Sequence, residues 1–359
     1  MTQQQTRDPE APIDPGCVHS EGLPRLLHER GLSVAMTSFQ ANRLMLVRSD
    51  GEQVDVLFRA VPRPMGLAVG EQQMLLGSWA QVLTYRRQDS LNEGVEPGLP
   101  VDATFVPCST VVTGNINIHD IAWGRDGEIW MVNSAFSCLA TLDTRYNFVP
   151  RWKPDFITSL VSQDRCHLNG MAMRDGQPAF VTVFSRDDTE LGWRSFKNEG
   201  MLMSVPGQQI LAEGLLFPHS PRWIDGWVYY CESGHGRVWR CRDDGSESTL
   251  VAELPGYTRG LDCVGSLLFI GLSRARVSDN APPLPLMQQH ETTVSGFWVI
   301  DLDTLQELGW LIFTGDVEQI YDVALIRRAC FPHVMAWDDE DFGHRFEFPP
   351  LSSLASGSV

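Results

Sequence analysis

The chain has 359 residues, of which 43% are apolar and 20% charged, which is typical of a globular protein with one or two domains. Its 45 acidic and 28 basic residues give a net charge of −17, which argues against a nucleic-acid partner because phosphate binding needs clustered Lys and Arg. No apolar run reaches the roughly 20 residues of a membrane span. The N-terminus MTQQQTRDPE also lacks the pattern of a secretion signal, so we predict a cytoplasmic protein without a membrane partner.

The first part of the chain divides into two segments. Residues 1–30 are rich in Pro, Gln and charge and predict a flexible N-terminal arm. Residues 31–58 contain three short apolar stretches, and Asp50-Gly51 between the last two is a strong hairpin signal. We therefore expect strands in this segment, ahead of the repeats that follow.

From about residue 63 onward the chain repeats one unit. A polar approach passes through a small or acidic residue into a first strand, as in RCHLNGMAM over residues 165–173. A turn and a second strand rich in aromatic and β-branched residues follow, and then two more strands. The equivalent openings lie near Gly66, Asp120, Gly170, Ser220, Gly260 and Asp322. Such a spacing, 40 to 62 residues with four strands per unit, is typical of β-propeller blades.

Six openings predict an all-β, six-bladed propeller. The sixth opening has too little chain after it to complete a blade, so the strands before residue 58 are expected to complete it and close the ring. Alternatives are a seven-bladed propeller or a pair of β-sandwiches. We expect the propeller to span residues 31–332, followed by a partly disordered extension over residues 333–359.

Two long segments interrupt the repeat. Residues 185–198 follow the second strand of the third unit, and residues 274–295 follow that of the fifth. In a propeller, the loop after a second strand lies on the same face as the start of the first strand. Both insertions should therefore rim the face that carries the openings, where they either close over a ligand or remain solvated. Their candidate side chains are Trp193, Lys197, Arg274 and Arg276.

The openings also carry polar side chains toward the central channel. Residues two apart on an extended chain face the same way, so His119, His167 and His219 are expected to converge at the channel mouth. Four further side chains are expected beside them: Asn169, Arg259, Tyr321 and Glu318.

Three converging imidazoles are common ligands of a divalent metal ion, and Zn, Fe, Mn or Ca are the candidates here. Asp120 or Glu318 would then be either a fourth ligand or a hydrogen-bond partner of one of the histidines. The alternatives are acid–base chemistry without a metal, with Tyr321 or Arg259 stabilising an oxyanion, or a structural role around the channel. Arginine at the mouth of so acidic a protein favours an anionic substrate.

Several of these segments resemble one known family. The motifs within residues 119–154, 165–173, 218–223 and 256–273 are similar to those of a bacterial family of hypothetical proteins with a domain of unknown function. That resemblance implies a propeller-like fold and no established activity. In architecture alone the chain is similar to gluconolactonase-like lactonases, streptogramin lyases and peptide-amidating lyases, which hold a metal or a catalytic histidine in the channel.

These observations predict a metal-dependent enzyme that acts on a small anionic metabolite by hydrolysis, lyase chemistry or isomerisation. His119, His167 and His219 would hold the metal, Arg259 would bind the anion, and Tyr321 or Asn169 would orient it. Two alternatives stay open. One is a non-catalytic propeller that binds a ligand or a protein partner on its top face, and the other is a metal-dependent oxidoreductase.

Overall fold

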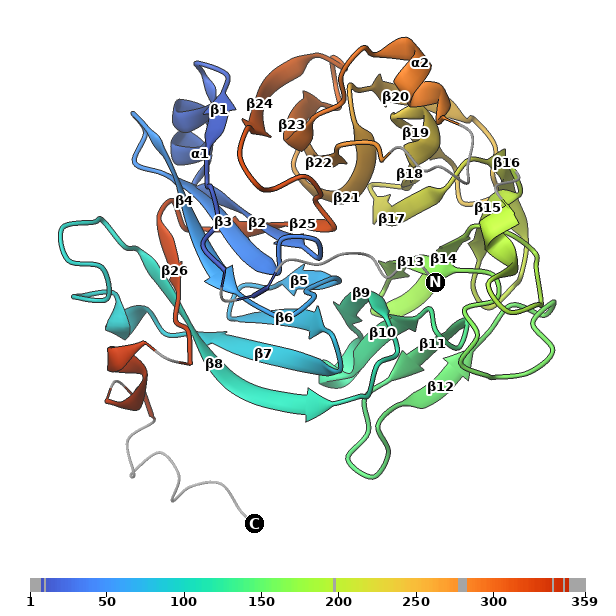
Figure 1. The fold of residues 1–359 in the computed structure, drawn as a ribbon, viewed down its shortest axis with the longest axis horizontal. Coiled ribbons are helices and arrows are strands. Elements are labelled where there is room, and N and C mark those ends of the chain that lie inside the picture. Colours follow the sequence, from blue (N-terminus) through green and yellow to red (C-terminus); the bar gives the residue numbers. More distant parts are fainter. Residues whose placement is uncertain are drawn as a thin grey trace.

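The structure, a computed structural model, describes residues 8–9, 11–195, 198–276, 283–337, 339–344 and 346–348. Their strands form six sheets arranged around one axis like the blades of a propeller (Figure 1). Neighbouring strands are antiparallel except at one outer edge. The predicted all-β, six-bladed propeller is confirmed.

Three blades are built from four consecutive strands each. The first of them contains β9 (Ile118–Trp123), β10 (Ile129–Asn133), β11 (Cys138–Thr141) and β12 (Val149–Trp152). The next contains β13 (Leu168–Arg174), β14 (Gln177–Val183), β15 (Gly200–Ser204) and β16 (Ile210–Leu215). The third contains β17 (Pro218–Ile224), β18 (Trp227–Glu232), β19 (Arg237–Cys241) and β20 (Thr249–Glu253).

Two blades gain a fifth strand from a distant part of the chain. One contains β5 (Leu67–Val69), β6 (Gln73–Ser78), β7 (Gln81–Arg87), β8 (Ala103–Val112) and the parallel outer strand β26 (Pro332–Val334). The other contains β21 (Tyr257–Val264), β22 (Leu267–Ser273), β23 (Ser295–Asp301), β24 (Glu307–Phe313) and the outer strand β1 (Cys17–His19). Short helices lie in the connections: η1 (Asp89–Leu91), η2 (Arg125–Gly127), η3 (Gly192–Ser195), η4 (Ser233–His235) and α2 (Pro285–Gln289).

The sixth blade joins the two ends of the chain. Its inner strand β25 (Asp322–Arg327) pairs with β2 (Leu32–Ser38), which continues into β3 (Arg43–Ser49) and β4 (Val54–Ala60). The predicted hairpin between β3 and β4 is present, with Gly51 at a φ of 98°. Ring closure by the N-terminal strands is therefore confirmed.

The predicted N-terminal arm is folded over its second half. β1 pairs with β24, and α1 (Leu23–Arg30) packs beneath the closing blade. Leu23 and Leu27 lie one helical turn apart and are fully buried in the same core cluster as β2 and β24. The boundary predicted at residue 31 is thus wrong, because an apolar helix face and a strand start earlier, at Cys17.

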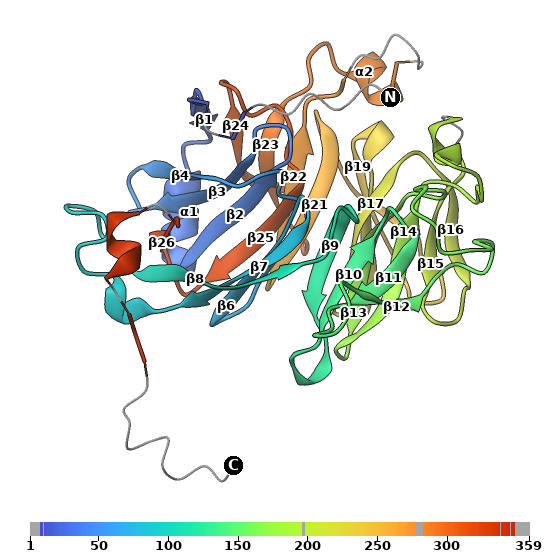
Figure 2. The ribbon, with the colours of Figure 1, turned by 60° about the horizontal axis from the view of Figure 1, so that its bottom comes forward.

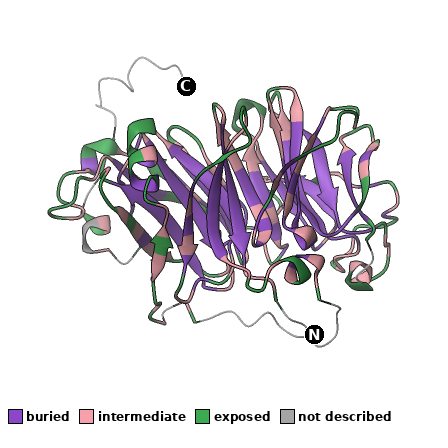
Figure 3. Ribbon diagram, turned by 90° about the horizontal axis from the view of Figure 1, so that it is seen from above, coloured by how far each residue is buried: buried purple, intermediate pink, exposed green. Residues whose placement is uncertain are grey.

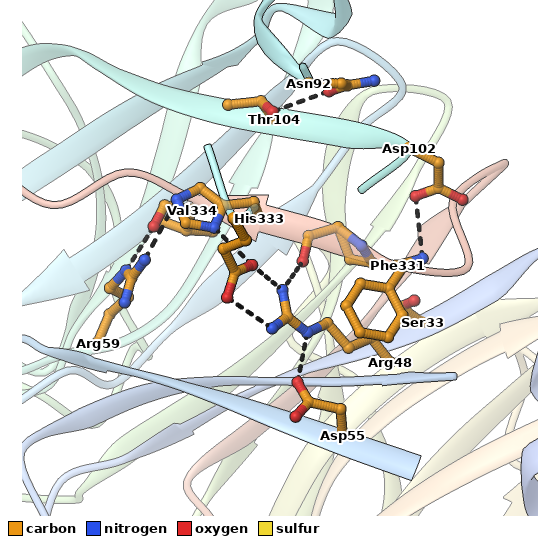
Figure 4. A network of polar contacts seen from close by, with 12 residues as sticks. Ser33, Arg48, Asp55, Arg59, Asn92, Asp102, Thr104, Phe331, His333 and Val334 are labelled. Carbon is orange, nitrogen blue, oxygen red and sulfur yellow. Dashed lines mark hydrogen bonds and ion pairs between the residues drawn. The ribbon is translucent and has the colours of Figure 1, made fainter. Parts of the chain in front are cut away.

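The boundary predicted at residue 332 is also too early, because β26 continues to Val334 and Met335 is buried. Behind β26 lies a clasp of ionic contacts, defined here as Arg48, Asp55, Glu96 and His333 (Figure 4). Arg48 is 2% exposed and donates to Asp55 at 2.6 Å and to Glu96 at 2.5 and 2.9 Å. His333 lies 2.9 Å from Glu96. Among the described residues past 335, only the 3-10 helix η5 (Glu340–Gly343) is regular, and residues 338, 345 and 349–359 of the predicted extension lie outside the described residues.

The six openings also hold neighbouring blades together. Acceptor side chains at three of them bind a backbone N–H of the next blade: Asp120 Oδ2 accepts from Met171 at 3.0 Å, and Ser220 Oγ accepts from Gly260 at 2.8 Å. Asp322 Oδ2 accepts in the same way from the N–H of Leu67 at 3.0 Å. These bonds fix the spacing of the inner strands that line the channel.

Glycine occupies the alternate openings, since there is no room there for a side chain. A Cβ on Gly66 would lie 2.9 Å from the backbone of Asp120, and one on Gly260 would lie 2.6 Å from the backbone N of Val323. Figure 3 shows that the closely packed strands are mostly buried and that most exposed residues lie in the connections. Alternating glycine with Asp or Ser is thus the sequence signature of the blade contacts.

Arg222 links blades across the axis. Its guanidinium donates to Asp120 Oδ2 at 2.9 Å, to Asp322 Oδ1 at 3.4 Å and to the carbonyl of Leu261 at 2.9 Å. Arg222 thus connects its own blade to three others. This cross-link lies next to the openings and supports the candidate site beside them.

Candidate functional site

The backbone kinks just before four of the inner strands. Arg63, Asn117, His167 and Phe217 occupy equivalent positions and have φ values of 46°, 53°, 50° and 54°. A side chain in this left-handed region costs roughly 1–2 kcal/mol, and such residues gather at functional sites. The chain is therefore not extended here, and simple alternation does not describe which side chains meet.

Two of these kinks orient a histidine two residues further on. His119 Nδ1 lies 3.1 Å from the carbonyl of Asn117, and His219 Nδ1 lies 3.0 Å from the carbonyl of Phe217 and 2.8 Å from Ser233 Oγ. A carbonyl oxygen can only accept, so Nδ1 carries the hydrogen in both rings. Each neutral ring then presents an unprotonated Nε2.

Both rings stay neutral around pH 7. Burial lowers the pKa of His119 and that of His219 well below the ordinary value, and repulsion from Arg259 and His167 lowers both further. The two Nε2 atoms are hydrogen-bond acceptors as a result.

His167 forms an acid–base pair with Asp164. Its Nδ1 lies 2.9 and 3.0 Å from the two carboxylate oxygens, and the indole N–H of Trp193 donates to the same carboxylate at 3.0 Å. The Trp193 ring also packs on His167, with centroids 4.2 Å apart. Since Trp193 lies in the insertion over residues 185–198, the prediction that this segment rims the mouth is confirmed.

The aromatic rings form one cluster, but the three histidines do not meet at a point. His119 packs edge-on against His167 with centroids 4.7 Å apart and against Tyr321 at 5.4 Å. Phe184 contacts both His167, at 4.5 Å, and His219, at 5.0 Å. His119 and His167 are therefore brought together as expected, whereas His219 packs against Phe184 and Tyr257.

The fit of this cluster to a metal is incomplete. Three histidines whose Nδ1 atoms are engaged suit ligation through Nε2. Among the described residues, however, no group of three or more His, Cys, Asp or Glu side chains has the geometry to hold a metal ion. The rings of His119 and His167 pack edge-on, and Phe184 contacts both His167 and His219. We therefore derive no chemical step through a metal.

Arg259 and Tyr321 form the polar centre of the mouth. The guanidinium carbon of Arg259 lies 3.4 Å from the centroid of the Tyr321 ring, within cation–π range. Tyr321 is 8% exposed, and its hydroxyl has no hydrogen-bond partner in the described part of the chain. Burial raises the pKa of Tyr321, so the phenol keeps its proton and is a donor. The structure thus brings two of the predicted residues together.

The remaining two predicted residues differ in their positions. Glu318 is exposed on the rim, 3.8 Å from Arg274, and is not in the histidine cluster. Asn169 is 4% exposed, and its amide donates to the carbonyl of His167 at 3.3 Å and accepts from Thr182 at 3.0 Å. The contact with residue 167 repeats those of His119 with Asn117 and of His219 with Phe217, so Asn169 occupies the equivalent blade position.

The second insertion contributes Arg276. Burial and then repulsion from Arg259 lower the pKa of Arg276, so the two guanidinium groups are electrostatic neighbours. Lys197, the remaining candidate on the insertions, lies outside the described residues. In Figure 2, α2 of this insertion lies on the upper face of the ring.

Sequence reasoning missed Asp164 and Phe184. Asp164 stands three residues before His167, a spacing at which the two side chains can meet in a turn, and this would have been a usable signal. Phe184 directly follows β14 and looked like a continuation of the core strand. Cys166 is fully buried and its burial raises the pKa of the thiol to about 12, so it is no nucleophile.

Comparison with solved structures supports the fold. A chain in the structure titled "Crystal structure of Nidogen/Laminin Complex" is similar to this one with a TM-score of 0.52 and 10% sequence identity, covering 83% of this chain and 100% of that chain. At this identity the likeness shows the architecture alone. Within the described residues, no helix has the length and apolar character needed to cross a membrane.

Comparison by sequence gives the family. No curated protein matches the chain. A family model described as a domain of unknown function, DUF4915, matches residues 21–335, which include every strand of the six blades except the outer strand β1. The resemblance found in the motifs is thereby confirmed, and the chain belongs to the DUF4915 family.

Proposed function

We propose that the protein is an enzyme that binds a small anionic metabolite at the channel mouth and moves a proton with the Asp164–His167 pair. The observation that carries the proposal is this pair, with Nδ1 2.9 Å from the carboxylate, in one cluster with His119, Tyr321 and Arg259. An acid–base pair beside a cation is the arrangement that general base catalysis on an anion requires.

The proton transfer uses both nitrogens of His167. Because Asp164 accepts the Nδ1 hydrogen, Nε2 is free to take a proton from a carbon or a water next to the bound anion. The carboxylate then stabilises the imidazolium, as in other carboxylate–histidine pairs. The hydroxyl of Tyr321 and the charge of Arg259 can stabilise negative charge that develops on an oxygen.

This chemistry fits a hydrolase, lyase or isomerase. A covalent mechanism would need a nucleophile beside the pair, and the adjacent Cys166 is buried with its thiol protonated. We therefore favour direct proton abstraction.

Deuterium exchange tests the proposal. A panel of small carboxylic acids is incubated with the protein in D2O, and loss of C–H signals is followed by proton NMR. We expect His167→Asn to slow exchange by about 100-fold or more. His235→Asn is the matched control, because His235 lies 3.1 Å from Glu232, also three residues earlier, and Glu232 likewise accepts from a tryptophan, Trp239.

Exchange that continues unchanged in His167→Asn would contradict the proposal. Binding of an acid without any exchange would instead support the second candidate, a propeller that binds its ligand without catalysis. That candidate rests on Arg259, whose side chain lies over the Tyr321 ring and forms no ion pair within the described part of the chain.

The divalent metal stays a prediction. Elemental analysis of the untagged protein, beside a triple variant with alanine at His119, His167 and His219, tests it. About one equivalent of metal that is lost in the triple variant would show that the rings rearrange around an ion, and the metal's identity would separate redox from hydrolytic chemistry.

A further inference from the structure

We propose that the ligand of the channel mouth is a carboxylic acid with a hydroxyl or amino group on the neighbouring carbon. This inference rests on the proposed function for the location of the site, but it concerns binding and not proton transfer. It follows from the donors, acceptors and apolar surfaces that the mouth presents.

The hydrogen-bond donors at the mouth indicate that the ligand is an anion. No ion pair with a carboxylate and no hydrogen bond is formed by the side chain of Arg259 within the described ranges, although the chain has a net charge of −17. Repulsion from Arg259 also contributes to the lowered pKa of Arg276, and the buried Tyr321 hydroxyl has no hydrogen-bond partner among the described residues. A guanidinium group without an ion pair, with an unused donor beside it, is stabilised by a planar oxyanion such as a carboxylate.

The hydrogen-bond acceptor at the mouth indicates that the ligand carries a hydrogen-bond donor. His119 carries its hydrogen on Nδ1, which faces the carbonyl of Asn117, so its Nε2 offers a lone pair. This ring is only partly buried and contacts Tyr321, whose ring lies under Arg259. A lone pair would repel a carboxylate oxygen. The group of the ligand that faces His119 must therefore be a hydroxyl or an amine next to the carboxylate.

Apolar side chains lie next to the histidines. Phe184, Leu216 and Phe217 form a buried cluster, and the partly buried Trp193, Tyr257 and Leu284 pack against it. Trp193 and Leu284 come from the two insertions. A ligand that also carries an apolar group can cover the exposed parts of these three side chains, so a hydroxy acid with an aromatic substituent is a suitable probe.

Three related compounds test the inference by isothermal titration: mandelate, phenylacetate, which lacks the hydroxyl, and mandelamide, which lacks the charge. We expect phenylacetate to bind the wild type about 10-fold more weakly than mandelate, and mandelamide about 100-fold more weakly. This comparison needs no variant and so does not depend on the folding of one.

Matched variants locate the contacts. Arg276→Gln should weaken mandelate binding about 10-fold, whereas Arg274→Gln, two residues away and paired with the exposed Glu318, should leave it within about 2-fold. His119→Phe should remove the preference for mandelate and leave phenylacetate binding unchanged.

Equal affinity for mandelate and phenylacetate would overturn the inference, as would tight binding of mandelamide or a failure of both acids to bind. The outcome is independent of the proton-transfer proposal. His167→Asn can abolish exchange on another anion when mandelate does not bind, and mandelate can bind when no exchange is seen.

Discussion

At the scale of single residues, the site depends on side chains whose orientation is set two positions earlier. The left-handed Asn117 and Phe217 turn their carbonyls toward the Nδ1 atoms of His119 and His219. The backbone thereby selects the tautomer of each ring before any ligand arrives. This is preorganisation, because the acceptors need no rearrangement on binding.

Removing a buried hydroxyl usually destabilises a protein, but removing that of Tyr321 should not. This hydroxyl is buried and has no hydrogen-bond partner among the residues that the structure describes. Tyr321→Phe should therefore leave the free energy of unfolding unchanged or raise it by about 1 kcal/mol, while weakening ligand binding. Urea unfolding of the ligand-free protein measures this. Tyr229→Phe is the control, since the Tyr229 hydroxyl accepts from Arg240 at 3.3 Å, and this variant should be destabilised. A comparable loss in both variants would mean that Tyr321 has a partner.

His219 should make stability depend on pH. Its pKa in the folded protein lies below the ordinary 6.5 because of burial and then the repulsion of Arg259. The unfolded chain therefore binds more protons as pH falls below about 6.5, and the free energy of unfolding decreases by up to about 1.4 kcal/mol per pH unit. The difference between wild type and His219→Gln, measured by urea unfolding from pH 7.5 to 5, should shrink at that rate toward acid.

The exposed His344 provides the comparison for this slope, and His344→Gln should follow the wild type. A constant difference between wild type and His219→Gln would show that the His219 ring takes up a proton in the folded state as readily as in the unfolded chain.

At the scale of elements, the central strands of the blades were easier to predict than the outer strands at the sheet edges. The second strands of the repeat, such as β6 and β22, are continuous apolar runs bounded by turns, so their positions follow from pattern alone. β1 and β26 are three residues long, and their partners are more than 200 residues away in the sequence. A sequence of three residues does not indicate which distant strand it pairs with, so neither outer strand was predicted.

The site shows the same limit. Arg259, Tyr321 and two of the histidines were located by aligning the openings, because equivalent blade positions share one environment. The orientation of His119, Asn169 and His219 was not predictable, because each follows a left-handed residue two positions earlier that breaks the alternation of an extended strand. Such a kink in a non-glycine residue leaves no local signal in the sequence.

The ionic clasp should hold the outer strand β26 in place against the rest of its blade. Burial opposes ionisation of Glu96, but hydrogen bonds from His333 and Arg48 lower its pKa to about 2. Glu96→Gln should therefore cost roughly 1–3 kcal/mol at neutral pH and speed amide hydrogen exchange in β26. The exposed Glu347, which contacts Ser90, provides the control variant Glu347→Gln.

The sign of the pH effect follows from that lowered pKa. The contribution of Glu96 is complete above the ordinary value of 4.5 and is lost as pH falls toward 2. The gap between wild type and Glu96→Gln should therefore close on acidification. Exchange in β26 that is equally slow in both proteins would mean that the strand is held by its backbone bonds alone.

At the scale of the whole molecule, the spacing of blades depends on the glycine openings. A Cβ on Gly260 would lie 2.6 Å from the Val323 backbone, whereas one on Gly265 would meet nothing within 4 Å, although both have positive φ, 83° and 57°. Gly265→Ala should cost about 1 kcal/mol and Gly260→Ala about 2–4 kcal/mol, because only the second forces two blades apart. Urea unfolding distinguishes them, and equal losses would show that backbone conformation is the whole effect.

The closing blade has a consequence for the order in which this protein is made. β2, β3 and β4 emerge from the ribosome before the other five blades, but the inner edge of β2 has no partner until β25, after residue 321, has been synthesised. Until then the nascent chain carries an open strand edge of seven residues, Leu32–Ser38, with every side chain destined for burial. Such an edge can pair with other chains. A ribosome that stalls before Asp322 would thus release an aggregation-prone product, and chaperone demand for this protein should end only after β25 has been synthesised.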